Sequence, residues 1–384
     1  MRLTSATVYA LEIPFVEAFK HSARDRRCCD SIVVRVRDEA GTEGFGEGVP
    51  RPYVTGETTE FVLERVARLW SETGGHELPD LDGRATLPAI EAWVPAADSG
   101  GLIADNASRA ALETAILDCV LRRRGTPLGR LLPPCRTKVT YSGVITAGTL
   151  ETALQQARRM KLIGIAQVKV KVGFDDDVAR IRALREALGP RVSLRLDANG
   201  AWTIERALEI LDSVASADIA AVEEPLGRGS LESLARLRRE VSVPIMADES
   251  LVTVADAEAL IAAQAVDYFN VRISKCGGLS RSLRIAGLAA TAGIGVQVGS
   301  QVGETAILSA AGRHLAAHLE QIAFVEGSYG TLLLTEDVSA DPVRFGHRGE
   351  APLLSGAGLG ARVLEDRLRK YARAVVELAP GASS

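Results

Sequence analysis

Five charged residues recur at a nearly constant spacing through the middle of the chain. They are, in order, Lys171, Asp197, Glu223, Asp248 and Lys275, and their numbers differ by 26, 26, 25 and 27. Each stands at or just past the end of a short apolar run, and a stretch with helical character follows it. A strand with its crossover helix takes about 30 residues, so the spacing predicts one such residue per strand–helix unit. In a barrel of parallel strands the chemistry lies where the strands end, and two cations bracketing three carboxylates there indicate a metal site with a base on either side.

The stretch from residue 167 to 172, Gln-Val-Lys-Val-Lys-Val, alternates polar and apolar residues as a strand does. Residues two apart in a strand face the same way, so Lys169 and Lys171 are both predicted to point into the barrel. Burying two ammonium groups is costly unless they are paired or perform chemistry. A like charge nearby lowers the pKa of a lysine, which suits a general base near neutral pH. The alternative is an edge strand with two solvated lysines.

Three acidic residues end three successive strand-like runs: Asp197 in Leu-Asp-Ala-Asn, Glu223 in Val-Glu-Glu-Pro and Asp248 in Ala-Asp-Glu-Ser. Oxygen ligands from separate strands suit Mg²⁺, and no Cys or His accompanies them, which argues against zinc. One such carboxylate alone is more typical of a helix N-cap or a surface charge, but three at the barrel spacing favour a metal site. Glu224 and Glu249 are adjacent to two of them with opposite strand parity, and are weaker ligand candidates.

The elements that must position these residues follow from the alternation of strand and helix patterns after residue 137, which is typical of a parallel sheet. Strands are expected near 138–145, 167–173, 192–197, 219–224, 243–248, 268–275, 294–299 and 322–326. Helices are expected near 149–163, 175–188, 203–216, 230–240, 253–264, 279–292 and 303–319. Eight strands and seven helices predict an α/β protein with a modified (β/α)8 TIM barrel of the (β/α)7β type.

An α+β capping domain is predicted to accompany the barrel. We expect residues 1–132 to form it, residues 133–327 to form the barrel, and residues 328–384 to return to the cap. Strands are predicted at residues 3–13 and 31–37, and the glycines at 41, 44, 46 and 48 are interpreted as turn residues. Two long polar loops, 14–30 and 48–57, are expected to cover the site, because long loops inside a compact domain are more often functional than idle.

The composition excludes several classes of protein. The chain has 384 residues and a formal net charge of −4, which argues against nucleic acid as a partner. No run of 18 apolar residues is free of charge, so no membrane span is expected. Five cysteines without a Cys-x-x-Cys pair indicate a reduced, cytoplasmic protein.

The motifs, taken in order, resemble those of the enolase superfamily, in particular its muconate-cycloisomerase (mandelate racemase/muconate lactonizing enzyme) subgroup. They are Lys-x-Lys at 169–171, Asp-Ala-Asn at 197–199, Glu-Glu-Pro at 223–225, Ala-Asp-Glu-Ser at 247–250 and Lys-x-Gly-Gly at 275–278. The likeness covers nearly the whole chain, from Gly-Glu-Gly at 46–48 to Gly-Ala-Gly-Leu-Gly at 356–360. It implies a small-molecule carboxylate substrate, Mg²⁺ (with Mn²⁺ as a possible substitute) and a homo-oligomer, an octamer or a dimer.

The resemblance also implies roles for single residues. Asp197, Glu223 and Asp248 would bind Mg²⁺, and Lys171 and Lys275 would be the acid/base residues. Residues expected beside the substrate or behind the ligands are Lys169, Asn199, Glu249, Gln301, Glu326, His21 and Tyr53. Gln301 stands in Gly-Ser-Gln-Val-Gly-Glu at 299–304, which departs from the Gly-x-Met-x-Glu-Ser usual at the seventh strand.

The favoured reaction is cycloisomerisation of a muconate-like dicarboxylate through abstraction of the proton next to a carboxylate. The segment 324–337, which contains Glu326, looks like the one that muconate-type cycloisomerases carry, and it lacks the Asp-x-Asp of dipeptide epimerases. Arg24, Lys20 or Arg51 in the capping loops would hold the second carboxylate. The alternatives are a racemase or epimerase of N-acyl or modified amino acids, a dehydratase of acid sugars or hydroxy acids, and a non-catalytic binding protein on the same fold.

Overall fold

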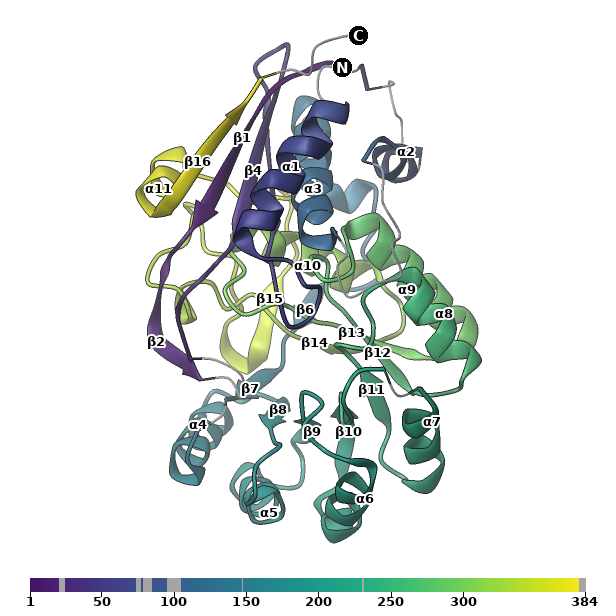
Figure 1. The fold of residues 1–384 in the computed structure, drawn as a ribbon. Helices are drawn as coiled ribbons and strands as arrows, with labels where there is room; N and C mark the ends of the chain where they lie inside the picture. Colours follow the sequence, from purple (N-terminus) through teal and green to yellow (C-terminus); the bar gives the residue numbers. More distant parts are fainter. Residues whose placement is uncertain are drawn as a thin grey trace.

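A computed structural model describes residues 1–20, 25–73, 77–78, 85–94, 105–146, 148–229 and 231–379. A barrel of parallel strands with helices outside it lies at one end, and a layer of antiparallel strands and helices covers it at the other (Figure 1). The predicted α/β barrel with a cap is therefore confirmed. In the described part of the chain, no helix is long and apolar enough to span a membrane.

The barrel sheet contains eight parallel strands in strictly sequential order, from β7 to β14. The strands are β7 (Gly143–Ile145), β8 (Gln167–Lys171), β9 (Ser193–Asp197), β10 (Ile219–Glu223), β11 (Ile245–Ala247), β12 (Tyr268–Val271), β13 (Gly295–Val298) and β14 (Ile322–Val325). The two ends of the sheet meet, because the amide of Ser142 donates to the carbonyl of Val325 at 2.7 Å. Closure brings the carboxyl ends of all eight strands to one mouth.

Seven helices connect the barrel strands, and the fold is the predicted (β/α)7β type. They are α4 (Leu150–Leu162), α5 (Asp177–Leu188), α6 (Ile204–Ser213), α7 (Leu231–Glu240), α8 (Val254–Ala262), α9 (Leu279–Ala292) and α10 (Ala306–His318). Thr149, Thr203, Thr253 and Thr305 cap four of them with a side-chain oxygen. In the described chain no eighth barrel helix comes directly after β14; short 3-10 turns at Gly330–Leu332 and His347–Gly349 take its place.

The first predicted strand, 138–145, is divided in two. β6 (Lys138–Thr140) pairs antiparallel with β15 (Glu350–Pro352) outside the barrel, and only β7 joins the barrel sheet. The change of partner falls between Tyr141 and Ser142, because the amide of Tyr141 donates to the carbonyl of Gly349, next to β15, and the amide of Ser142 donates to Val325 of the barrel. The division depends on a partner strand more than 200 residues away, which local alternation does not reveal.

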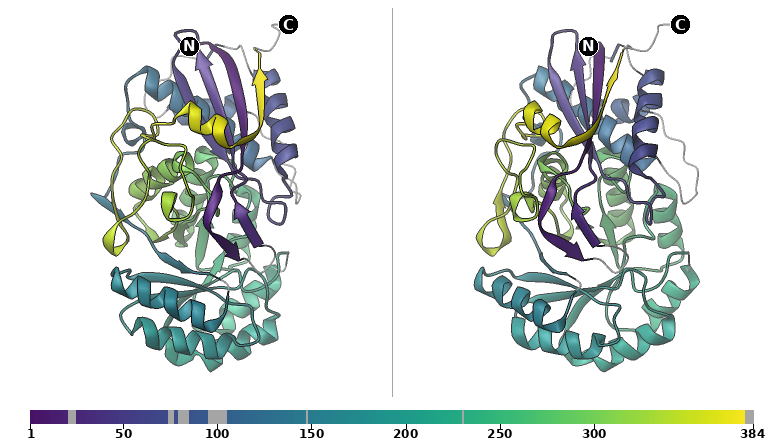
Figure 2. Two further views of the ribbon diagram at one scale, coloured as in Figure 1. Left: turned by 90° about the vertical axis from the view of Figure 1, so that its left-hand side faces the viewer. Right: turned by 60° about the vertical axis from the view of Figure 1, so that its left-hand side comes forward.

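The cap contains a four-stranded antiparallel sheet in the order β16-β1-β4-β5. Its strands are β16 (Ala372–Leu378), β1 (Leu3–Leu11), β4 (Ile32–Asp38) and β5 (Glu43–Gly48), and its helices are α1 (Thr59–Thr73), α2 (Thr86–Trp93), α3 (Asn106–Arg123) and α11 (Glu365–Tyr371). β16 pairs along β1, so the C-terminal segment returns to the cap as predicted (Figure 2). The exact division into domains stays a prediction.

Strand β5 corrects the interpretation of its glycines as turn residues. Gly44, Gly46 and Gly48 share one face of the strand, which packs on α3. A Cβ at any of them would lie within 2.3 Å of the backbone of α3. The alternate glycines therefore let the strand and the helix approach each other.

The polar segment 14–30 is a two-stranded ribbon rather than a plain loop. β2 (Pro14–Lys20) pairs with β3 (Asp25–Cys28), and the ribbon extends from the cap toward the barrel (Figure 2). The amide of Val16 donates to the carbonyl of Leu333, and that of Thr335 to the carbonyl of Pro14. These bonds join the ribbon to the chain that follows β14.

Candidate active site

Three neighbouring strands present the predicted metal ligands at the mouth of the barrel. Asp197 ends β9, Glu223 ends β10, and Asp248 directly follows β11. All three side chains are fully buried. Glu224 faces elsewhere, because its carboxylate accepts the amides of Asp248 and Ser250. The structure thus orders the three carboxylates along one row, from β9 to β11.

Two lysines of β8 lie beside the Asp197 end of this row. Lys171 Nζ lies 2.6 Å from Asp197 Oδ2 and 2.6 Å from Asn199 Oδ1. Lys169 Nζ contacts three carboxylates: Glu326 at 2.8 Å, Asp197 at 3.1 Å and Glu223 at 3.2 Å. Burial lowers the pKa of Lys169, but these carboxylates outweigh it and hold the pKa well above its ordinary value. The expectation that this pair carries depressed pKa values is therefore wrong for Lys169.

Lys275 lies at the other end of the row. It does not end its strand but follows β12 by four residues, in the turn before α9. Its Nζ donates to the Asp248 side chain at 2.9 Å, to the Asp248 carbonyl at 2.6 Å and to the Asn270 carbonyl at 2.8 Å. β8 and β12 are four strands apart in an eight-stranded barrel. Lys171 and Lys275 therefore flank the carboxylate row from opposite sides of the ring.

Two arginines complete the site, and sequence reasoning missed both. Arg272 donates to Asp248 and, at 3.4 Å, to Glu223. Arg195 donates to Gln297 and, at 2.9 Å, to Glu326. A signal existed: Arg195 has the strand parity of Asp197, and Arg272 has that of Asn270, which donates to Glu223 from inside the barrel.

The carboxylates differ strongly in proton affinity. Burial acts to raise the pKa of both Asp197 and Asp248, but nearby cations outweigh it. Lys171 and Lys169 hold the pKa of Asp197 below its ordinary value. Arg272 and Lys275 lower the pKa of Asp248 to about 2. Burial and the charge of Asp197 raise the pKa of Glu223 to about 7. Burial and the charge of Asp248 raise that of Glu249 to about 8. Burial and the neighbouring carboxylates therefore favour the protonated forms of Glu223 and Glu249.

A cavity of about 180 Å³ opens onto these groups. Its polar floor includes Lys169, Lys171, Asn199, Glu249, Arg272 and Glu326. The rest of its lining is formed by Arg51, Tyr53, Val144, Thr146, Ser300, Val302, Tyr329, Leu332 and Leu333. Asp197, Glu223, Asp248 and Lys275 lie behind this lining. The loop at 48–57 and the segment after β14 thus form part of the wall, whereas the ligand-type carboxylates lie deeper.

The remaining predicted residues divide into three groups. Tyr53, Asn199, Glu249 and Glu326 line the cavity, and Asn199 donates to Glu249 at 3.0 Å. Gln301 is buried behind the lining, and its neighbours Ser300 and Val302 face the cavity instead. His21 and Arg24 lie outside the described residues, as does the side chain of Lys20.

The row of carboxylates has the donor chemistry of a hard divalent cation, because it offers only oxygen atoms. Two observations agree with such a group: Glu249 Oε2 is buried without a partner, and the pKa of Glu223 is raised. In the described chain, however, no three acidic, His or Cys side chains already surround one point. Arg272 contacts two of the carboxylates, and a metal ion would have to displace its guanidinium.

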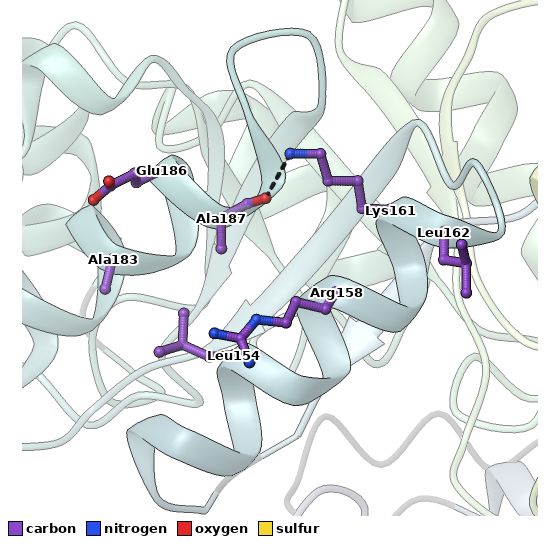
Figure 3. Close-up of a pocket in the computed structure, with 7 residues that line it drawn as sticks. All are labelled: Leu154, Arg158, Lys161, Leu162, Ala183, Glu186 and Ala187. Carbon is purple, nitrogen blue, oxygen red and sulfur yellow. Dashed lines mark hydrogen bonds between the residues drawn. The ribbon is translucent and has the colours of Figure 1, made fainter.

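A wider hollow of about 820 Å³ lies outside the barrel, between α4 and α5 (Figure 3). Its lining includes Leu154, Arg158 and Lys161, and Lys161 Nζ donates to the carbonyl of Ala187 at 3.1 Å. None of the acid/base or carboxylate candidates lines it. The chemistry therefore belongs to the smaller cavity at the barrel mouth.

A capped (β/α)7β barrel with lysines flanking a row of carboxylates defines a class of barrel enzymes that work by acid/base chemistry. Residues 152–367 match the family described as Enolase C-terminal domain-like. The chain is 32% identical to the hydrophobic dipeptide epimerase of Enterococcus faecalis, over 94% of this chain and 99% of that protein. It is 30% identical to muconate cycloisomerase 1-2 of Acinetobacter lwoffii, over 97% and 96%.

Solved structures agree with these relatives. The N-succinyl Arg/Lys racemase of Bacillus cereus superposes with a TM-score of 0.89 at 26% identity, covering 98% of this chain and 100% of that one. The dipeptide epimerase of Enterococcus faecalis, solved with Mg and the dipeptide L-Leu-L-Tyr, gives a TM-score of 0.84 at 30% identity, with coverages of 94% and 99%. The chain belongs to the enolase superfamily and, like these relatives, is an isomerase.

Proposed function

We propose that this protein is a magnesium-dependent racemase or epimerase of N-acyl or otherwise modified amino acids. The observation that carries the proposal is the placement of Lys171 and Lys275 at opposite ends of the row of buried carboxylates. Inverting a carbon centre requires a base on one face and an acid on the other, which this arrangement supports.

The proton transfers follow from that placement. One lysine, unprotonated, takes the proton from the carbon next to the substrate carboxylate, and the electron pair of the broken C–H bond passes into the carboxylate as an enolate. The other lysine, protonated, returns a proton to the opposite face. Lys275 has to exchange one of its three present acceptors for the substrate. A positioned lysine accounts for about 10²–10⁴-fold of the rate.

Asp197, Glu223 and Asp248 would hold the metal ion, and a bound Mg²⁺ would stabilise the charge that develops on the substrate carboxylate. The Mg present in the structure of the Enterococcus faecalis epimerase supports this choice. Mn²⁺ as a substitute, a homo-oligomer (octamer or dimer) and a cytoplasmic location stay predictions.

The apolar part of the cavity wall supports an uncharged substituent on the substrate. Val144, Val302, Leu332 and Leu333 contribute apolar surface to it. Arg51, the cation of this wall, is already engaged by Asp30 at 2.7 Å and by the carbonyls of Pro50 and Val302. A second substrate carboxylate would have to compete with those partners. An N-acyl amino acid with an apolar side chain would not have to compete with the partners of Arg51.

Muconate-type cycloisomerisation, which the sequence favoured, is the second candidate. Glu326 supports it, because the residue lines the cavity in the segment that resembles the cycloisomerases, and the relative from Acinetobacter lwoffii is a muconate cycloisomerase. Arg51→Met distinguishes the candidates: it should impair turnover of a dicarboxylate far more than turnover of an N-acyl amino acid with an apolar side chain.

The test is a substrate screen in D₂O with Mg²⁺, covering N-acyl amino acids, dipeptides, muconates and hydroxy acids. We expect deuterium at the α-carbon and loss of optical activity for an N-acyl amino acid. Lys171→Ala and Lys275→Ala should each abolish racemisation, yet each should still exchange the α-proton of one enantiomer, a different one in each variant. Lactone formation from a muconate without exchange of any amino acid derivative would refute the racemase.

A further inference from the structure

The turn that carries Lys275 is enclosed by a helix of the cap. α3 packs on β5 of the cap sheet and reaches α9 of the barrel. A Cβ at Gly277 would lie 2.7 Å from Asn106 Oδ1, and one at Gly278 would lie 1.8 Å from Glu113 Oε2. Both glycines have positive φ. The Gly-Gly pair after Lys275 therefore provides the space that two polar side chains of α3 occupy.

Asn106, the first residue of α3, binds the main chain of Lys275 directly. Its Nδ2 donates to the Lys275 carbonyl at 2.6 Å and to the Val252 carbonyl at 3.0 Å, and its Oδ1 accepts from Arg281 at 3.1 Å. Asn106 is fully buried. The nitrogen and the oxygen of the side-chain amide are thus both hydrogen-bonded, and one buried residue of the cap joins the turn to the loop after β11.

Glu113 holds the same turn at a different point and offers a matched comparison. It accepts the amide and the hydroxyl of Ser280, both at 2.8 Å, and makes no bond to Lys275. Both residues lie on α3, both are buried, and both contact the start of α9. Only Asn106 reaches the backbone of the acid/base residue.

We propose that Asn106 is a positioning residue for Lys275, so that the cap sets the efficiency of one of the two proton-transfer directions. The inference rests on the proposed function, in which Lys275 serves one enantiomer. The Lys275 ammonium is held by Asp248 and Asn270 of the barrel, whereas its main-chain oxygen is held by the cap. Losing the second hold lets the turn shift, and a shift of about 1 Å is enough to reduce a proton-transfer rate by about 10²-fold.

The experiment measures α-proton exchange in D₂O for each enantiomer separately, with Mg²⁺ and the best N-acyl amino acid, by NMR. Lys275→Ala first identifies the enantiomer that depends on Lys275. Asn106→Ala should slow exchange of that enantiomer by about 10-fold or more, while exchange of the other stays within about 2-fold of wild type. Asn106→Asp keeps the acceptor for Arg281 and removes the donor to Lys275, so it should show the same asymmetry.

Glu113→Gln is the structural control. It should change exchange of both enantiomers by the same factor, even where it lowers the midpoint of thermal unfolding. Asn199→Ala, which removes a partner of Lys171, should slow the opposite enantiomer. Should Asn106→Ala not fold, Asn106→Ser is assayed in its place.

Equal slowing of both enantiomers by the Asn106 variants, or no slowing of either, would overturn the positioning role while leaving the racemase proposal intact. A wild-type protein that exchanges neither enantiomer of any amino acid derivative would instead remove the proposed function itself. The two failures are therefore distinguishable.

Discussion

Replacing Lys169 by Met tests whether this lysine balances the charge of the buried carboxylates. The substitution keeps a similar length and removes the ammonium that lies 2.8 Å from Glu326, 3.1 Å from Asp197 and 3.2 Å from Glu223. Removing one partner of a buried ion pair costs about 3–5 kcal/mol, because it leaves an uncompensated charge in the interior. The variant should therefore be markedly less stable than wild type.

The remaining cations set where in this range the cost falls. Asp197 keeps Lys171 at 2.6 Å, Glu326 keeps Arg195 at 2.9 Å, and Glu223 keeps Arg272 at 3.4 Å. Each carboxylate thus retains one cationic partner, and we expect a loss near the lower end, about 3 kcal/mol. Glu223 has the longest remaining contact with a cation and a pKa already raised to about 7, so it should take up a proton. The loss should therefore be larger at pH 8 than at pH 6.

Urea unfolding followed by circular dichroism measures this loss for wild type, Lys169→Met, Glu326→Gln and the double variant, at both pH values. The double variant should cost less than the sum of the single ones, with a coupling of about 1–3 kcal/mol. Added Mg²⁺ should restore part of the stability of Lys169→Met, because it binds the folded state alone. A loss below about 1 kcal/mol in Lys169→Met, or strict additivity in the double variant, would refute the charge-balance argument.

Three further predictions concern the metal, the cap and the turn after Lys275. EDTA should abolish α-proton exchange, and Mg²⁺ should raise the midpoint of thermal unfolding of wild type but not of Asp248→Asn. In the cap, burial raises the pKa of Glu57 from 4.5 to about 7, although hydrogen bonds from Ala107 and Thr55 act to lower it. The folded state therefore binds more protons than the unfolded state, and the free energy of unfolding should fall as the pH rises from about 4.5 to about 7. Urea titrations of Glu57→Gln should show a flatter pH dependence. Gly278→Ala would place a methyl group 1.8 Å from a carboxylate oxygen of Glu113, at a position whose backbone φ is +115°. The substitution should lower the free energy of unfolding by at least about 2 kcal/mol. An unchanged urea midpoint would contradict the close contact.

Much of the barrel could be predicted because its signals are local. The alternation around Lys169 and Lys171 depends only on the period of a strand, and both side chains do line the cavity. The regular spacing of Asp197, Glu223 and Asp248 depends only on the length of a strand–helix unit. In the structure the first two end successive strands, and Asp248 directly follows the next one. Parallel closure then brings them together without further information.

Other features depend on residues that are distant in sequence, and local patterns missed them. β6 leaves the barrel because β15 pairs with it, and β5 is a strand of glycines because α3 packs against it. The pKa of Lys169 is raised rather than lowered because Glu326 and Glu223 arrive from other strands. Arg195 was passed over because one basic residue within an apolar strand does not reveal its partner.

The amino-acid sequence by itself determined the kind of barrel, the order of its strands and the residues at their ends, since periodicity and unit length are properties of a short stretch of chain. Only the tertiary structure decided which charged and polar groups meet: Arg272 against two carboxylates, Arg51 held by Asp30, and Asn106 bound to the carbonyl of Lys275 across 169 residues of chain. The physical reason is that electrostatic and hydrogen-bond energies depend on distances of a few ångströms, and those distances are set by the closure of the barrel, by the fold of the cap and by the packing of one on the other.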